Sequence, residues 1–143
     1  MIQNIFKRHY FIKLLTIILI PTLLNACQLI SPLFVEYNGV RMDVAKWINH
    51  QQLLSMQQKR SLAQLSRAQQ KLVKIDEIPN TKKIDISKEN AIAMHCARLY
   101  LSDSKITQLQ NQVFDIKTKQ QILEKFDRDF PKLKIDVSQI QCD

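Results

Sequence analysis

The chain has 143 residues, a formal net charge of +8 at pH 7, 45% hydrophobic residues and a single glycine, Gly39. This length is enough for one small domain with a modest core, and not for two. With one glycine, the chain lacks a phosphate-binding loop, a nucleophile elbow and a dinucleotide-binding turn, so the enzyme classes built on these motifs are excluded.

Residues 1–26 have the composition of a bacterial secretory signal. Three basic residues, Lys7, Arg8 and Lys13, precede an apolar run over residues 14–24, which ends at Leu24-Asn25-Ala26-Cys27. This junction resembles the lipobox of bacterial lipoproteins, whose signal is cleaved before a cysteine that carries a diacylglycerol. The resemblance implies that Cys27 is the lipidated residue and that the lipid anchors the protein to a membrane.

An uncleaved transmembrane helix is the alternative interpretation of this segment. Such a helix needs about 20 mostly apolar residues. Residues 14–24 are too few, Pro21 interrupts them, and Lys13 and Asn25 flank them. We therefore favour the lipoprotein. Gln28 stands where the inner-membrane retention signal of that family has Asp, which implies transfer to the outer membrane, facing the periplasm.

Cleavage changes the charge of the mature protein. Removing 26 of the 143 residues leaves 117, and three of the 21 Lys and Arg leave with them while all 13 Asp and Glu stay, so the net charge falls to +5. The basic residues are spread along the chain rather than gathered in one tract, and no platform of alternating aromatic and basic residues is present. We therefore expect no nucleic-acid partner.

Residues 27–39 form a short connector between the lipid and the domain. It contains the apolar residues Leu29, Ile30, Leu33, Phe34 and Val35 and no flexible Gly- or Ser-rich tract. We expect it to lie along the domain or in the membrane interface. Residues 40–143 are expected to form a single helical domain close to the bilayer.

Two helices are predicted at the start of this domain. Val44, Trp47 and Ile48 form the apolar stripe of a short helix that is broken near residues 50–54. Ser55 and Gln58 have the spacing of a capping box, which predicts the start of a longer helix reaching about residue 75. Its apolar side carries Leu62, Leu65, Ala68, Leu72 and Ile75, and its polar side carries Lys59, Arg60, Gln64, Arg67 and Lys71.

A break at Pro79-Asn80 is followed by residues 83–87, which alternate like a short strand. Ser87 is predicted to cap a third helix with Ile92, Cys96 and Leu99 on one side. Ser102 is predicted to start a fourth helix. It carries Ile106, Leu109 and Val113.

Residues 119–129 are predicted to form a fifth helix, with Ile122, Phe126 and Phe130 aligned before Pro131 stops it. The tail alternates again over residues 133–137. The sequence therefore predicts a mainly α fold, a small bundle of four to five helices with one disulfide. A minor two-stranded pairing of residues 83–87 with 133–137 is left open.

The disulfide joins the two cysteines that remain once Cys27 carries lipid. Cys96 and Cys142 are then the two remaining cysteines, and an even number of cysteines in an oxidising compartment is typical of disulfide bonding. A bond between them closes a loop of 46 residues. The loss of chain entropy in the unfolded state is then expected to stabilise the fold by about 4 kcal/mol.

The spacing of these cysteines matches neither a CxxC motif nor a zinc pattern. The neighbouring His95 and Cys96 point in different directions on a helix, so no metal or other cofactor is expected.

Residues 37–62 resemble the opening of a family of uncharacterised helical lipoproteins of proteobacteria. The likeness rests on Tyr37-Asn38, Trp47-Ile48-Asn49 and the run from Leu54-Ser55-Met56 to Leu62, with Met56 in place of the proline of the family. The resemblance implies a helical lipoprotein, but it indicates no biochemical activity, because the family is uncharacterised.

No catalytic constellation is visible in the sequence. Asp127 and Asp129 are two residues apart on a predicted helix and do not face each other, and His50 and His95 have no seryl partner at a recognisable spacing. We therefore expect neither an enzyme nor a small-molecule substrate.

Two functions of different classes remain. One is a protein-binding adaptor or assembly factor of the cell envelope, as in the disulfide-bonded helical pilotins, which are similar in size and layout. The other is a structural or accessory envelope lipoprotein without a dedicated groove for a partner. For the adaptor, the predicted partner-binding face is the polar side of the long helix, formed by Gln57, Arg60, Gln64, Arg67 and Lys71.

Overall fold

The computed structural model describes residues 39–142, which contain five α-helices, two short 3-10 helices and no strand. The prediction of a mainly α fold is therefore confirmed. Cys27, the signal and most of the connector lie outside the described residues. In chain order the helices are α3 (Met42–Asn49), α4 (Met56–Gln70), η2 (Lys71–Glu77), α5 (Asn80–Tyr100), α6 (Asp103–Val113), α7 (Lys119–Asp129) and η3 (Val137–Gln139).

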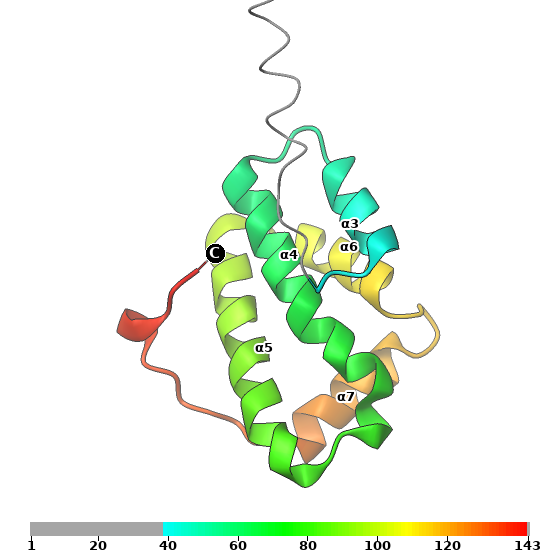
Figure 1. Cartoon of the computed structure of the whole chain (residues 1–143), viewed down its shortest axis with the longest axis vertical. Coiled ribbons are helices and arrows are strands. Elements are labelled where there is room, and N and C mark those ends of the chain that lie inside the picture. The colour runs from blue at the N-terminus through cyan, green and yellow to red at the C-terminus, as the bar shows by residue number, and fades with distance from the viewer. Residues whose placement is uncertain (1–38, 143) are drawn as a thin grey trace, which may run out of the picture. The chain divides into compact units, whose positions relative to one another are not determined.

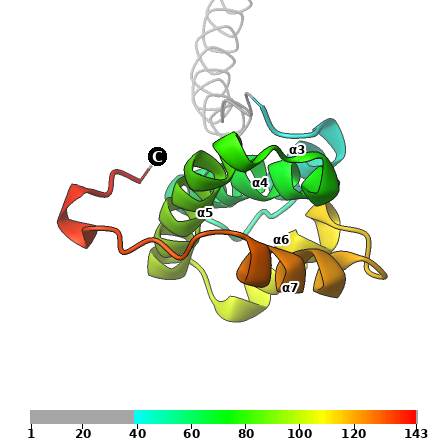
Figure 2. The same ribbon diagram turned by 90° about the horizontal axis from the view of Figure 1, so that it is seen from below.

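Helix α4 is the centre of this arrangement, because it contacts α3, α5 and α6 (Figure 1). Its most extensive contact is with α5, which returns beside it. The 3-10 helix η2 follows α4 directly in the chain, is kinked at Lys74 and packs on α7. Seen from below, α6 and α7 lie beside the α4–α5 pair (Figure 2). Among the described helices, none combines the length and the apolar character that crossing a bilayer requires.

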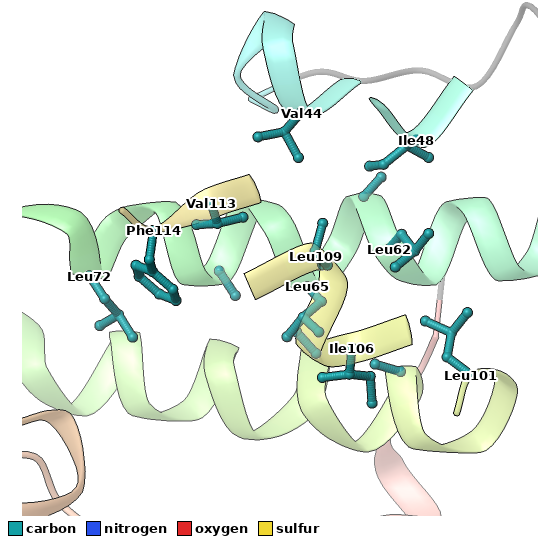
Figure 3. Packing of buried hydrophobic residues seen from close by; sticks show 14 residues of the cluster. Val44, Ile48, Leu62, Leu65, Leu72, Leu101, Ile106, Leu109, Val113 and Phe114 are labelled. Atoms are coloured by element: carbon teal, nitrogen blue, oxygen red, sulfur yellow. The ribbon is translucent and has the colours of Figure 1, made fainter. Parts of the chain in front are cut away.

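The core is built from apolar side chains that α3, α4, α5 and α6 direct toward one another (Figure 3). Leu62 and Leu65 of α4 are fully buried, as the predicted apolar side of the long helix requires. Helix α7 closes the core with half-buried side chains only. The buried members that Figure 3 labels are Val44, Ile48, Leu62, Leu65, Leu72, Leu101, Ile106, Leu109, Val113 and Phe114.

The capping box at the start of α4 is confirmed. Ser55 Oγ accepts a hydrogen bond from the Gln58 amide at 3.2 Å, and the Ser55 amide donates to Gln58 Oε1 at 2.9 Å. The α-helix ends at Gln70, and the remaining predicted turns are the 3-10 helix η2. The placement of Lys59 on the polar side was wrong, because its side chain is buried and Nζ donates to the Asn49 carbonyl at 3.4 Å.

Residues 83–87 are helical, so the predicted strand was wrong. Pro79 immediately precedes the first residue of α5, where a missing amide hydrogen costs nothing and the fixed φ favours a helix start. Ser87 is therefore a buried residue in the middle of α5 and not its cap. The buried side of the helix is formed by Ser87, Asn90, Ala93, Cys96 and Ala97, and Leu99, predicted to share a side with Cys96, is exposed.

The predictions for α6 and α7 are confirmed. Ser102 Oγ accepts from the Lys105 amide at 3.3 Å at the start of α6, and α7 has the predicted bounds. The pairing of residues 133–137 with 83–87 was wrong, since residues 83–87 belong to α5 and residues 131–136 form no strand. The tail instead runs from α7 back to α5, where Cys142 is bonded to Cys96.

Candidate partner-binding groove

A groove of about 630 Å³ lies between α4 and α5, and three residues of the predicted partner-binding face contribute to it. We call it the α4–α5 groove. Gln64 and Arg67 lie on α4, and Lys71 follows directly as the first residue of η2. The three residues are one or two helical turns apart, so they follow one another along the same side. The other lining residues are Gly39, Ala68, Gln70, Glu89, Ile92 and Ala93.

The backbone near Gly39 is fastened to α4 beside this groove. Gln70 Nε2 donates to the Gly39 carbonyl at 3.2 Å, and Gln70 Oε1 accepts from the Arg41 amide at 2.6 Å. Gly39 has a φ of +77°, and a Cβ atom built there would lie 3.4 Å from Cδ of Arg67. A side chain at residue 39 is therefore disfavoured by the left-handed backbone, whereas its Cβ atom would be at van der Waals contact with Arg67.

The charged residues of the groove are two cations and one acid. Lys71 Nζ pairs with a carboxylate oxygen of Glu89 on α5, and both side chains remain about half exposed, at 49% and 46%. An ion pair this exposed adds little to stability. Arg67 is half-buried and lies nearer the start of α4. The described lining residues of the groove thus include two cations and one acid, of which Lys71 and Glu89 are paired.

The floor of the groove is apolar, with one buried polar atom. Ala68 and Ala93 are buried and Ile92 is half-buried. Gln64 Oε1 is buried, and no hydrogen-bond partner for it lies within residues 39–142. The groove thus combines a small apolar surface, one buried hydrogen-bond acceptor and charged groups at its edge.

The structure does not bring all five predicted residues together. Gln57 is half-buried in the first turn of α4, and Arg60 is exposed one turn further on. Both lie on the same side of the helix as Gln64 but do not line the groove. The predicted face is thus divided into two parts. One part lines the α4–α5 groove, and the other, formed by Gln57 and Arg60, lies outside it near the start of α4.

Sequence reasoning missed the α5 half of the groove. Glu89, Ile92 and Ala93 have the i, i+3, i+4 spacing of one helical side, which was available as a signal. The predicted third helix included these residues, but its apolar side was assigned from Ile92, Cys96 and Leu99, so this spacing was not connected to the face on α4.

Cys96 and Cys142 are bonded in the structure, with their Cα atoms 5.5 Å apart. Cys96 is fully buried in α5 beside the core residue Ala97. The bond therefore attaches the end of an otherwise exposed tail to the most buried side of α5.

The acidic and imidazole groups considered for catalysis lie apart. Asp127 pairs with Lys132, and Asp129 pairs with Arg128. His50 Nδ1 lies 2.7 Å from the Lys46 carbonyl at the end of α3. Within residues 39–142, no cluster of three or more His, Cys, Asp or Glu side chains could hold a metal ion.

Comparison with known proteins found no family model, no curated protein sequence and no solved structure that matches this chain.

Proposed function

We propose that this protein is a periplasmic lipoprotein, anchored to the outer membrane through Cys27, that acts as a protein-binding adaptor or assembly factor of the cell envelope. The lipobox-like junction Leu24-Asn25-Ala26-Cys27 and the residue Gln28 support the anchor and the compartment. The Cys96–Cys142 bond fits an oxidising compartment.

One observation carries the binding function: Gln64, Arg67 and Lys71 line a single groove between two helices. An amphipathic helix of a partner can be held in such a groove when it presents apolar side chains to the floor and complementary charge to the rim. The partner segment is proposed to be such a helix, with its apolar residues packed on the floor formed by Ala68, Ile92 and Ala93.

The experiment is site-specific photocrosslinking in living cells. A photoreactive amino acid replaces Lys71 at the groove, and in a matched strain it replaces Lys117, an exposed lysine that does not line the groove. One stoichiometric envelope protein crosslinked from residue 71 and not from residue 117 supports the adaptor. Broad recovery of abundant neighbours from both positions would instead indicate a structural or accessory lipoprotein.

Charge reversal on the same helix provides the control for specificity. Arg67→Glu places a carboxylate in the groove and is expected to reduce crosslinking from residue 71 at least about tenfold, which corresponds to about 1.4 kcal/mol of binding free energy. Arg60→Glu makes the same change outside the groove and is expected to have a smaller effect. Equal loss in both variants would show that general charge, and not the groove, recruits the partner.

The anchor is tested separately. Cys27→Ser is expected to leave an uncleaved precursor that incorporates no labelled palmitate. Cleavage at the same bond with palmitate still incorporated would contradict the lipoprotein assignment and leave the groove experiment unaffected.

A further inference from the structure

The described chain begins at Gly39, which lies in the α4–α5 groove. Cγ and Cδ of Arg67 lie beside this residue. The backbone on both sides of Val40 is bonded to Gln70 of α4, through the Gly39 carbonyl at 3.2 Å and the Arg41 amide at 2.6 Å. Val40 itself packs against the hydrophobic core. Gly39 is therefore held in place at the groove.

This attachment limits the positions that the residues just before Gly39 can take. Consecutive Cα atoms are about 3.8 Å apart, so the Cα atom of Tyr37 is at most about 7.6 Å from that of Gly39, and the Cα atom of Glu36 at most about 11 Å. The covalent chain alone therefore keeps residues 35–38, Val-Glu-Tyr-Asn, close to the groove. A segment tethered in this way loses far less translational and rotational entropy on docking than a separate molecule does.

Tyr37 matches the apolar floor of the groove. Ala68, Ile92 and Ala93 form this floor, and the groove has a volume of about 630 Å³. Sites of about 300–1,000 Å³ enclose whole drug-sized ligands, so an aromatic ring and its neighbours fit. A tyrosine ring buries a large apolar area while its hydroxyl can stay at the edge in contact with water. Tyr37 is thus the residue of this segment best suited to cover the floor.

Glu36 matches the cationic edge of the groove. It is the only charged residue among residues 35–38. Because the aliphatic part of Arg67 lies beside Gly39, the Arg67 guanidinium is within reach of a side chain three residues earlier. The other cation of the groove, Lys71, is paired with Glu89. Complementary charge of this kind fixes the register of a docked segment more than it adds affinity.

We propose that residues 35–38 dock into the α4–α5 groove, with the Tyr37 ring on the apolar floor and the Glu36 carboxylate beside Arg67. Of the two locations expected for the connector, the domain and the membrane interface, this assigns its last residues to the domain. The docking does not rest on the proposed adaptor function. Only its consequence does, namely that a partner helix must displace residues 35–38 to reach the floor.

The test is photocrosslinking within the purified full chain, reconstituted into vesicles of phosphatidylethanolamine and phosphatidylglycerol. Benzoylphenylalanine replaces Tyr37, and in a matched protein it replaces Met42, which is 70% exposed and does not line the groove. Mass spectrometry locates the crosslinks. Residue 37 is expected to crosslink to Ile92 or Ala93 of the same molecule, and residue 42 to neither. Since both targets lie on α5, the attachment of Gly39 to α4 does not by itself account for such crosslinks.

Charge variants test the register of the docked segment. Arg67→Glu and Glu36→Arg each bring like charges together, and each is expected to reduce the crosslinks to α5 about threefold, the scale of one exposed ion pair. The double variant restores opposite charges and is expected to restore the yield. Arg60→Glu, on the same helix but outside the groove, is the control and is expected to leave the yield unchanged. Circular dichroism verifies that each variant is folded.

Two outcomes would overturn the proposal. One is crosslinking from residue 37 to lipid or to a second copy of the chain, with none to α5. The other is a folded double variant that does not recover the yield. No partner protein is present in this experiment, so neither outcome bears on the adaptor function. Conversely, failure to capture a partner from residue 71 in cells would leave the docking of residues 35–38 unaffected.

Discussion

Asn90 of α5 donates a buried hydrogen bond to the backbone carbonyl of Ala68 on α4, at 3.2 Å. It links the two helices between which the α4–α5 groove lies. The two walls of the groove are thus joined by a buried contact.

Removing this contact is expected to destabilise the fold. Asn90→Ala loses both hydrogen bonds of the amide in a buried site, and we expect the free energy of unfolding to fall by about 1–3 kcal/mol. Urea denaturation measures the change. Asn80→Ala, at an exposed asparagine in the first turn of the same helix, is the control and is expected to change stability by no more than about 0.5 kcal/mol. Similar values for the two variants would contradict the role of Asn90.

Leu65 tests the assignment of the core side of α4. The residue is 0% exposed, so Leu65→Ala is expected to lower the free energy of unfolding by about 2–5 kcal/mol. Leu53→Ala, at a leucine that is 100% exposed, is expected to have almost no effect in the same urea titration. If Leu65→Ala left stability unchanged but abolished partner crosslinking, the leucine side and not the polar side of α4 would be the binding face.

The disulfide is expected to contribute about 2–4 kcal/mol to stability. Cys96→Ala, Cys142→Ala and the double variant should all show the same fall in melting temperature, because each loses the same bond once. A reducing agent is expected to bring the unmodified protein down to that temperature and to leave the variants unchanged. Two free thiols in the unfolded, unreduced protein would contradict the pairing.

Asp43 provides a test by pH. Hydrogen bonds from Arg41 at 2.7 and 2.8 Å lower the pKa of the Asp43 carboxyl below its usual value of 3.8. A lowered folded-state pKa contributes stability that is present above pH 3.8 and is lost as the pH falls through the folded-state value. Because both side chains are largely exposed, Asp43→Asn is expected to cost less than about 1 kcal/mol at pH 7.

The difference between the unmodified protein and Asp43→Asn should therefore disappear in strong acid. Thermal melts from neutral pH down to below the usual carboxyl pKa measure it. Arg41 also donates to the carbonyls of Gln112 and Val113 at the end of α6. A difference that grows as the pH falls would show that the carboxylate does not hold Arg41 in this position.

The elements whose start depends on local chemistry could be predicted from the sequence. The Ser55–Gln58 capping box, the Ser102 cap and the stop at Pro131 act over three or four residues, so the starts of α4 and α6 and the end of α7 were recovered. These caps satisfy backbone groups that a helix end always leaves open.

The start of α5 could not be predicted in the same way, because its buried side is polar. Ser87 and Asn90 occupy core positions that a search for hydrophobic periodicity passes over, while the exposed Ile84 produced a false alternation with Ile86. The α4–α5 groove was only half recovered, because the side of α5 that packs beside α4 is set by long-range contacts that the spacing within one helix does not specify.

The Cys96–Cys142 bond also makes residues 96–142 a closed covalent ring that contains α6, α7 and the exposed tail. A protease that cuts the ring once, for example after the exposed Lys134, opens it but separates nothing, because both new ends remain joined through the cystine. A lipid at Cys27 would therefore keep every part of the domain on the membrane after such a cut. Release of a fragment would require a second cut or reduction of the bond.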